Sequence, residues 1–352
     1  MTESSDLDGA IEMIRQSAAG IADRQALNRI RRLRFTMPGF DRSVWNDMCE
    51  LGWPGLRVAE ERGGVGMGLS AYCALTEELG AALAPEPLIG AALAAALVDD
   101  DTLDLLLSGV SLVLPAWQDQ RDAFGPTADL RVECGRLWGR KLQVKMAEGA
   151  DAFLAVGRTM SWLIDANAPG VCLETAETQD GGHVGALILE GVTGRPIARD
   201  PQPALAEACL ATSAYLLGVM DAALAKTVEY LGVRVQFGKL IGSFQALQHR
   251  AVDLRLQVEL TRASVEDAAL RWDRDPASAA SYAAISRAKV RASAAAMLVT
   301  RQCIQLHGGI GFTDEHDIGL YLRKAMVTAP QFGSAALHKA NYARLLPVGE
   351  GN

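Results

Sequence analysis

The chain has 352 residues, of which 49% are hydrophobic and 22% are charged, and its formal net charge is −8. This length is too great for one simple core, so we expect two or three structural regions. Abundant alanine and leucine and few aromatic residues (6%) favour packed helices over sheet. The negative charge argues against nucleic acid as the main partner, although a local basic patch could still bind an anionic ligand.

No segment predicts export, membrane insertion or a metal site. The N-terminal stretch MTESSDLDGAIEMIRQ is polar and acidic and lacks the apolar core of a signal peptide. The most apolar run, LIGAALAAALV, is shorter than the roughly 20 residues that span a bilayer. Six cysteines without a CxxC pair and five histidines without metal-type clustering argue against zinc and disulfides. We therefore expect a cytoplasmic protein with no metal and no membrane partner.

Up to about residue 110, apolar residues recur at helical spacing. FDRSVWNDMCELGW and LSAYCALTEELGAALA both show this pattern, and Pro85 and Pro87 end the second run. Between them lies RVAEERGGVGMG, where we expect a turn and not a phosphate-binding loop, because helices flank it on both sides. We predict an N-terminal helical domain over residues 1–110.

The pattern changes over residues 111–202, where short runs rich in Val, Leu and Ile, such as VSLVLPAW and HVGALILEGV, alternate with Gly, Asp, Asn and Pro. Such runs predict a small β-barrel or sandwich. Long helix-forming runs follow, such as SFQALQHRAVDLRLQVELTRASVEDAALRWDR, and predict a four-helix bundle over residues 203–352. The predicted fold is therefore mostly α with a central β-domain.

Several motifs in this order resemble those of the acyl-CoA dehydrogenase family of flavoenzymes. RVQFGKLIGSFQALQHRAVDL is similar to the family's R-x-x-FG…FQ signature, and QLHGGIGFTDEH…YLRKA to its Q-x-x-GG-x-G…R signature. LGWPGLRVAEERGGVGMG with ALTEELG resembles its N-terminal domain. The resemblance covers nearly the whole chain. It implies the family's three-domain architecture, FAD as cofactor, an acyl-CoA substrate, and electron-transfer flavoprotein or a similar acceptor.

The resemblance further implies a tetramer in which one subunit's β-domain holds the flavin ring and a neighbour's bundle holds the ADP half of FAD. Carried over by position, the residues that contact this ADP half are Arg234, Gln236, Phe237, Gln245, Gln305, Gly308 and Gly309. Arginine suits phosphate oxygens, and glycines let backbone N–H groups approach an anion closely. Taken singly, the arginine could be a solvated charge at a helix end and the glycines a helix C-cap.

The chain departs from the family at the catalytic base. The family's commonest base lies in a Y-E-G-T stretch, and here residues 331–334 are QFGS, so Phe332 stands at the glutamate position. A minority of members place the glutamate on the first bundle helix, where this chain has Ala208 with Glu207 one residue earlier. A one-residue shift rotates a side chain by about 100° around a helix. Glu207 therefore reaches a substrate only if the helix start is irregular.

Other catalytic motifs differ as well. The family's CoA-phosphate arginine aligns with Cys209, its flavin-lining T-E-P-G-A-G-S-D loop is replaced by LPAWQDQRDAFG, and its W-I-T pattern is Gln143-Val144-Lys145. Trp117 is either a replacement aromatic or an ordinary core residue. Motifs for the ADP half of a neighbour's FAD are thus present, whereas those for this subunit's own flavin, base and CoA are missing. This combination resembles the short subunit of heteromeric α2β2 dehydrogenases of bacterial steroid degraders.

We therefore predict a family member that takes part in FAD-dependent α,β-desaturation of an acyl-CoA thioester. Within that reaction we expect it to be the auxiliary subunit of an α2β2 heterotetramer, where it completes the FAD site of a second acyl-CoA dehydrogenase subunit. Two alternatives stay open, namely a self-sufficient homotetramer with Glu207 as the base and a flavin-free structural or binding relative. A flavin oxidase or monooxygenase on the same fold is also open.

Overall fold

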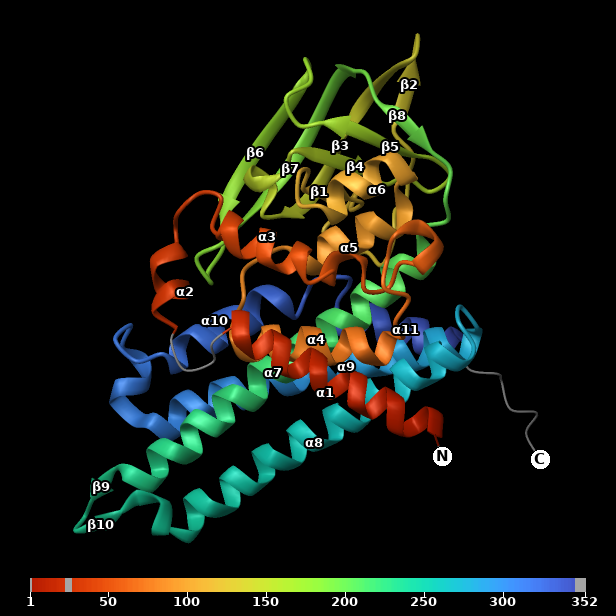
Figure 1. Ribbon diagram of the computed structural model, residues 1–352. Helices are drawn as coiled ribbons and strands as arrows, with labels where there is room; N and C mark the ends of the chain where they lie inside the picture. Colours follow the sequence, from red (N-terminus) through yellow and green to blue (C-terminus); the bar gives the residue numbers. More distant parts are fainter. Residues whose placement is uncertain (1, 23–26, 346–352) are drawn as a thin grey trace. The chain divides into compact units, whose positions relative to one another are not determined.

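The computed structural model describes residues 2–22 and 27–345 of the chain (Figure 1). Contacts within the chain divide it into two compact units. The mixed unit comprises Arg29–Tyr72 and Pro85–Cys209, and the helical unit comprises Met1–Asn28, Cys73–Ala84 and Leu210–Asn352. Each unit is described by itself.

The helices of the mixed unit are short, and two of them begin at side-chain caps. Asp41 accepts a hydrogen bond from the N–H of Ser43, and Asp99 accepts one from the N–H of Thr102, so each carboxylate satisfies a free N–H of the first turn. The helix between Leu88 and Leu97 is almost wholly apolar and largely buried. These elements are α2 (Asn28–Leu33), α3 (Arg42–Glu50), η1 (Trp53–Gly55), η2 (Glu60–Arg62), α5 (Leu88–Leu97) and α6 (Asp100–Leu107).

The strands of the mixed unit form two four-stranded sheets (Figure 1). The first has the order β1 (Val113–Ala116), β4 (Ala152–Ala155), β5 (Ser161–Asp165), β8 (Arg195–Ile197), and its β1–β4 pair is parallel. The second is antiparallel, with the order β2 (Arg131–Glu133), β3 (Arg136–Lys145), β7 (His183–Val192), β6 (Val171–Glu177). An isolated β-bridge joins Gln118, in the segment after β1, to Leu142 in β3. The short helix η3 (Ala147–Gly149) follows β3. The expected central β-region is confirmed.

The helical unit contains the long helices. They are α1 (Thr2–Ile21), most of α4 (Leu69–Ala81), most of α7 (Gln202–Val233), α8 (Gln245–Arg274), α9 (Ala279–His307), α10 (Ile318–Thr328) and α11 (Ala335–Leu345). The short elements β9 (Val235–Gln236), β10 (Lys239–Leu240) and η4 (Ile241–Ser243) join α7 to α8, and η5 (Gly308–Phe312) follows α9. The fold is therefore mostly α with N-terminal helices, a central β-region and a C-terminal bundle, as predicted.

The compact units cut across the domain boundaries predicted at residues 110 and 202. Cys73–Ala84 belongs with the C-terminal bundle because α4 crosses α7 at very short range. A Cβ added to Gly218 would lie 1.8 Å from the carbonyl oxygen of Glu77, and one added to Gly80 would lie 2.0 Å from that of Tyr215. Only glycine permits this approach of two backbones. Arg15 of α1 also binds Glu77 at 3.0 Å, so the N-terminal helix packs on the bundle too.

Among the described residues, α7 is the one helix whose length and apolar composition would allow it to cross a membrane. In its most apolar window, 89% of the residues are buried inside the protein. Burial of this kind is normal for the central helix of a bundle, so length and composition alone are weak support for a membrane span.

Candidate functional site

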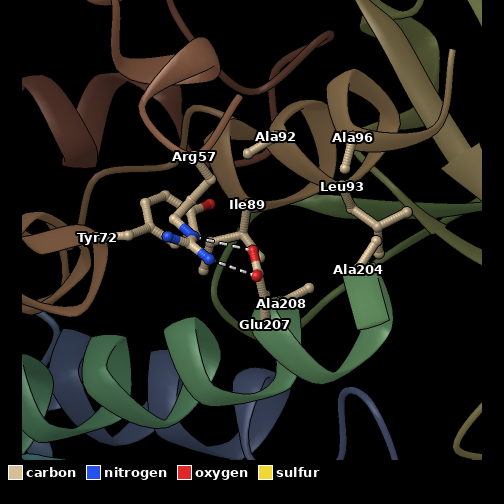
Figure 2. A pocket seen from close by; sticks show the side chains of 9 residues that line it. All are labelled: Arg57, Tyr72, Ile89, Ala92, Leu93, Ala96, Ala204, Glu207 and Ala208. Carbon is tan, nitrogen blue, oxygen red and sulfur yellow. Dashed lines mark hydrogen bonds and ion pairs between the residues drawn. The ribbon is translucent and has the colours of Figure 1, made fainter. Parts of the chain in front are cut away.

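Glu207 lies on α7, within the mixed unit, and forms a two-point ion pair with Arg57. The Nε of Arg57 donates to Oε2 of Glu207 at 3.0 Å, and its second terminal nitrogen donates to Oε1 at 2.6 Å (Figure 2). Arg57 also donates to the carbonyl of Met67. Both side chains are mostly buried, with exposures of 20% and 19%. Each oxygen of Glu207 thus accepts one hydrogen bond from Arg57, which fixes the orientation of the carboxylate.

A cavity of about 10 Å³ adjoins this ion pair, which is room for about one water molecule. Its walls are mostly apolar. The lining residues are Arg57, Tyr72, Ile89, Ala92, Leu93, Ala96, Ala204, Glu207 and Ala208 (Figure 2). Both Glu207 and Ala208 line the cavity although α7 is continuous from Gln202. The glutamate therefore lines the cavity although the helix start is regular.

Phe332 occupies the segment between α10 and α11 and is 8% exposed. Its φ angle of 58° is unusual for a bulky residue. Nε2 of His338 lies 2.7 Å from its carbonyl oxygen, and Lys289 donates to the carbonyl of Ala329 at 2.9 Å. Buried polar side chains thus hold the backbone here, while the side chain at the position of the family's usual base is a phenyl ring that accepts no proton.

The loop after β1 is tied to β3 by a buried charge pair. Lys141 is only 1% exposed in its side chain and binds Asp119, which also accepts the N–H groups of Thr127 and Ala128 at 2.7 and 3.1 Å. Burial would raise the pKa of Asp119, but these hydrogen bonds, led by the one from Lys141, lower it overall. Trp117, next to this loop, is 6% exposed. It is a buried residue and presents no open aromatic face.

The cofactor residues predicted between α7 and α8 lie on an exposed hairpin of the helical unit. Gln236 pairs with Lys239 across β9 and β10. Phe237 and Gly238 form the tip with φ angles of 54° and 78°, as a tight two-residue hairpin turn requires. Phe237 is 91% exposed. Arg234, at the base of the hairpin, is also exposed and forms no ion pair with the residues that the structure describes.

The glycine turn after α9 is open as well. Gly308 has a φ angle of 68° and ends the helix, its N–H donating to the carbonyl of Gln305. A Cβ added to Gly308 or Gly309 would meet no atom of the described residues within 4 Å, so the space beside these two Cα atoms is open. Gln305 and Gln245 are exposed too. The turn is a helix C-cap, which is one of the two interpretations that the sequence left open for these glycines. Its exposed backbone still leaves room for a ligand.

Three rings connect the base of the hairpin to the glycine turn. Tyr230 stacks on His307 with ring centres 4.5 Å apart, and His316 lies 4.6 Å from His307. His307 is 3% exposed, and its burial, together with the nearby His316, lowers its pKa despite the hydrogen bond to Cys303. Residues 230–234 and 307–309, far apart in the sequence, thus lie beside each other.

Two features of the site were not predicted from the sequence. Arg57 stands in a segment predicted only as a turn, and nothing in the sequence pairs it with Glu207. Tyr230 and His316 lie outside the motif positions used for the prediction.

No group of three or more His, Cys, Asp or Glu residues that could hold a metal occurs within residues 2–22 and 27–345.

Comparison with known families gives two matches. Residues 9–99 match the acyl-CoA dehydrogenase N-terminal domain, and residues 200–346 match the acyl-CoA dehydrogenase C-terminal domain. Among curated proteins, the acyl-CoA dehydrogenase IpdE2 of Mycolicibacterium smegmatis is 31% identical over 328 residues, which cover 92% of this chain and 94% of that protein.

Two similar solved structures are each named for two components. The steroid acyl-CoA dehydrogenase Tcur3481–Tcur3483, a G363A variant, aligns with a TM-score of 0.83 and 29% identity, covering 97% of this chain and 98% of that one. The ChsE4–ChsE5 complex from Mycobacterium tuberculosis aligns with a TM-score of 0.84 and 26% identity, covering 98% of each chain.

Proposed function

Because the chain belongs to the acyl-CoA dehydrogenase family of FAD-dependent oxidoreductases, we propose that it is the auxiliary subunit of a heteromeric acyl-CoA dehydrogenase. In this role it binds the ADP half of an FAD whose flavin ring lies in a catalytic partner subunit. The partner supplies the base that removes the α-proton of the acyl-CoA thioester, and the bound FAD supplies the hydride acceptor.

The observation that carries this proposal is the ion pair between Arg57 and Glu207. Glu207 is the candidate base that the sequence offers. Arg57 donates one hydrogen bond to each of its carboxylate oxygens, at 3.0 and 2.6 Å. The adjoining cavity of about 10 Å³ has room for about one water and no acyl chain. Phe332 supplies no base at the family's usual position. Together these features argue against acyl-CoA desaturation by this chain alone.

The helical unit, in contrast, fits the ADP half of FAD. Arg234 is exposed without an ion pair among the described residues, Phe237 projects into solvent, and the backbone of Gly308 and Gly309 is uncovered. An arginine beside the exposed backbone of Gly309 can bind a diphosphate, and an exposed aromatic ring can pack on adenosine. Gln236, Gln245 and Gln305 add exposed amides on the same connecting segments and helix ends.

The relatives support a partner of the same family. Tcur3481–Tcur3483 is named as a steroid acyl-CoA dehydrogenase and ChsE4–ChsE5 as a complex. We extend this arrangement to the present chain as an α2β2 heterotetramer with a steroid-type acyl-CoA substrate. We further propose electron-transfer flavoprotein or a similar protein as the electron acceptor, and a cytoplasmic location.

Purification of the chain alone and with a co-expressed partner tests the auxiliary role. We expect little flavin absorbance and no desaturase activity from the chain alone, and both from the complex. Arg234→Ala should then reduce FAD retention by the complex, because it removes the charge that faces the diphosphate. Full FAD occupancy together with desaturase turnover by the isolated chain would refute the proposal.

A second candidate function is a self-sufficient homotetramer with Glu207 as the base. It is favoured by one observation, namely that Glu207 lines the cavity together with Ala208. Under this alternative, Glu207→Gln abolishes most turnover while the protein stays folded and yellow. Under the auxiliary role, Glu207→Gln in the complex leaves turnover unchanged.

A further inference from the structure

The ring cluster, defined as Tyr230, His307 and His316, joins three chain segments of the helical unit. Tyr230 is on α7, His307 is the last residue of α9, and His316 lies just before α10. Tyr230 stacks on His307 at 4.5 Å with an angle of 22° between the rings. His316 packs against both, at 4.6 Å from His307 and 6.1 Å from Tyr230. Each ring therefore touches the other two.

Tyr230 is fixed to the base of the exposed hairpin. Its carbonyl accepts the N–H of Arg234 at 2.9 Å, and the carbonyl of Arg234 accepts the N–H of Ile241 at 2.9 Å. The hairpin is thus closed at Arg234, one helical turn beyond Tyr230. The backbone of Tyr230 is thus hydrogen-bonded directly to the start of the hairpin.

The two histidines are fixed to the two ends of the glycine turn. Nδ1 of His307 lies 2.8 Å from the carbonyl oxygen of Cys303, so this nitrogen carries the proton, and the ring orientation is set within α9. Nδ1 of His316 accepts the N–H of Ile318 at 3.1 Å, at the start of α10. The turn that contains Gly308 and Gly309 therefore begins and ends at members of the ring cluster.

Nε2 of His307 is buried and has no hydrogen-bond partner among the described residues. The hydrogen bond at Nδ1 leaves this nitrogen as an acceptor, and a buried acceptor without a partner costs free energy. No described hydrogen bond therefore orients this side of the ring, which packs against Tyr230 and His316.

We propose that the ring cluster sets the distance between Arg234 and the Gly308–Gly309 backbone, so that Tyr230, His307 and His316 are positioning residues for the diphosphate of FAD. This inference rests on the proposed FAD-binding role of the helical unit. The three rings need no contact with the cofactor. They act because a diphosphate can bind a guanidinium and an exposed glycine backbone together only when the spacing is correct to within about 0.5 Å.

The test measures FAD affinity of the complex between this chain and its partner subunit, by flavin fluorescence, for a series of variants. Tyr230→Leu should weaken FAD binding about tenfold, because loss of the ring lets the two loops shift. Tyr230→Phe should stay within about twofold of the unchanged protein, because it keeps the stack. His316→Asn keeps an acceptor for Ile318 but removes the ring, and should also weaken binding.

Tyr342→Leu is the matched control, because Tyr342 is a half-buried tyrosine on α11 outside the cluster. It should leave FAD affinity unchanged. If Tyr230→Leu lowers the melting temperature but the folded complex binds FAD as before, the cluster is only structural and the inference is wrong. Should Tyr230→Leu not fold, His316→Asn decides by the same criterion.

Arg234→Ala separates this inference from the proposed function. If Arg234→Ala weakens FAD binding and neither Tyr230→Leu nor His316→Asn does, the ring cluster has no positioning role and the auxiliary function stands. If Arg234→Ala also has no effect, the helical unit does not bind the diphosphate, and the proposed function fails first.

Discussion

Arg57 and Glu207 are 150 positions apart in the sequence, yet two nitrogens of the guanidinium bind the two oxygens of the carboxylate. Both side chains line the cavity that also borders α5 and the start of α7. The ion pair therefore holds Glu207, the acidic side chain next to the family's alternative base position, in the wall of this cavity.

Arg57→Leu should destabilise the protein by about 1–3 kcal/mol, because it leaves a mostly buried carboxylate without its partner. The double variant Arg57→Leu/Glu207→Leu should recover part of this loss. Urea unfolding of the two single variants and the double variant gives the coupling energy. As a control, Arg131→Leu removes an exposed pair with Glu133 and should change stability by less than about 1 kcal/mol. Equal effects of Arg57→Leu and Arg131→Leu would contradict the prediction.

Gly218→Ala should be strongly destabilising, because the added Cβ would lie 1.8 Å from the backbone oxygen of Glu77. The crossing of α4 and α7 must widen, at a cost of about 3 kcal/mol or more. Gly232 of the same helix has no atom within 4 Å of its added Cβ. Gly232→Ala should therefore be neutral or stabilising by up to about 1 kcal/mol. Thermal unfolding of both variants tests the contrast, which vanishes if α4 and α7 do not pack closely.

Stability should fall as the pH drops below about 6.5, the ordinary pKa of histidine. Burial lowers the pKa values of His183 and His307 in the folded protein. The unfolded chain therefore binds more protons below pH 6.5, and protonation favours unfolding. Melting temperatures between pH 8 and 5 measure the effect. His307→Phe should reduce the dependence of the melting temperature on pH. The same change at the exposed His249 should not reduce it. An equal pH dependence in both variants would contradict the assignment of the effect to buried His307.

Phe237→Ser should leave the stability of the isolated chain unchanged within about 0.5 kcal/mol, because the ring is 91% exposed. The same change should lower FAD retention by the complex several-fold, because it removes the ring available to the adenosine. Phe35 of the mixed unit is 53% exposed, and Phe35→Ser should alter neither quantity. Unfolding and flavin absorbance give the two measurements, and unchanged FAD retention in Phe237→Ser would refute the contact.

Native thiol labelling should modify Cys134 and Cys172 and spare the other four cysteines. Cys134 and Cys172 are exposed, whereas Cys49, Cys73, Cys209 and Cys303 are buried. Burial raises the pKa of Cys49 to about 12 and that of Cys303 to about 11, so neither forms a thiolate near neutral pH. Iodoacetamide at pH 8 followed by mass spectrometry counts the labelled sites. Rapid labelling of Cys303 in the folded protein would contradict the buried position of α9.

The helical and β segments could be predicted because their signals are local. LIGAALAAALV predicts a buried helix, and α5 is one; HVGALILEGV alternates in the way of a strand, and β7 shows that alternation in its burial. The grouping of the segments into compact units could not be predicted in the same way. The segment Cys73–Ala84 joins the bundle through Gly80 and Gly218, and close approach of two backbones leaves no periodic trace in a sequence.

The sequence by itself determined the family, the order of elements and the residues expected to face the ADP half of FAD, because signature motifs and hydrophobic periodicity are carried by neighbouring residues. It could not determine that Glu207 is paired with an arginine. Arg57 lies 150 positions away in the sequence, and only the tertiary structure brings it to both carboxylate oxygens. The same holds for Tyr230, His307 and His316, whose contacts exist only because three separate helix ends meet.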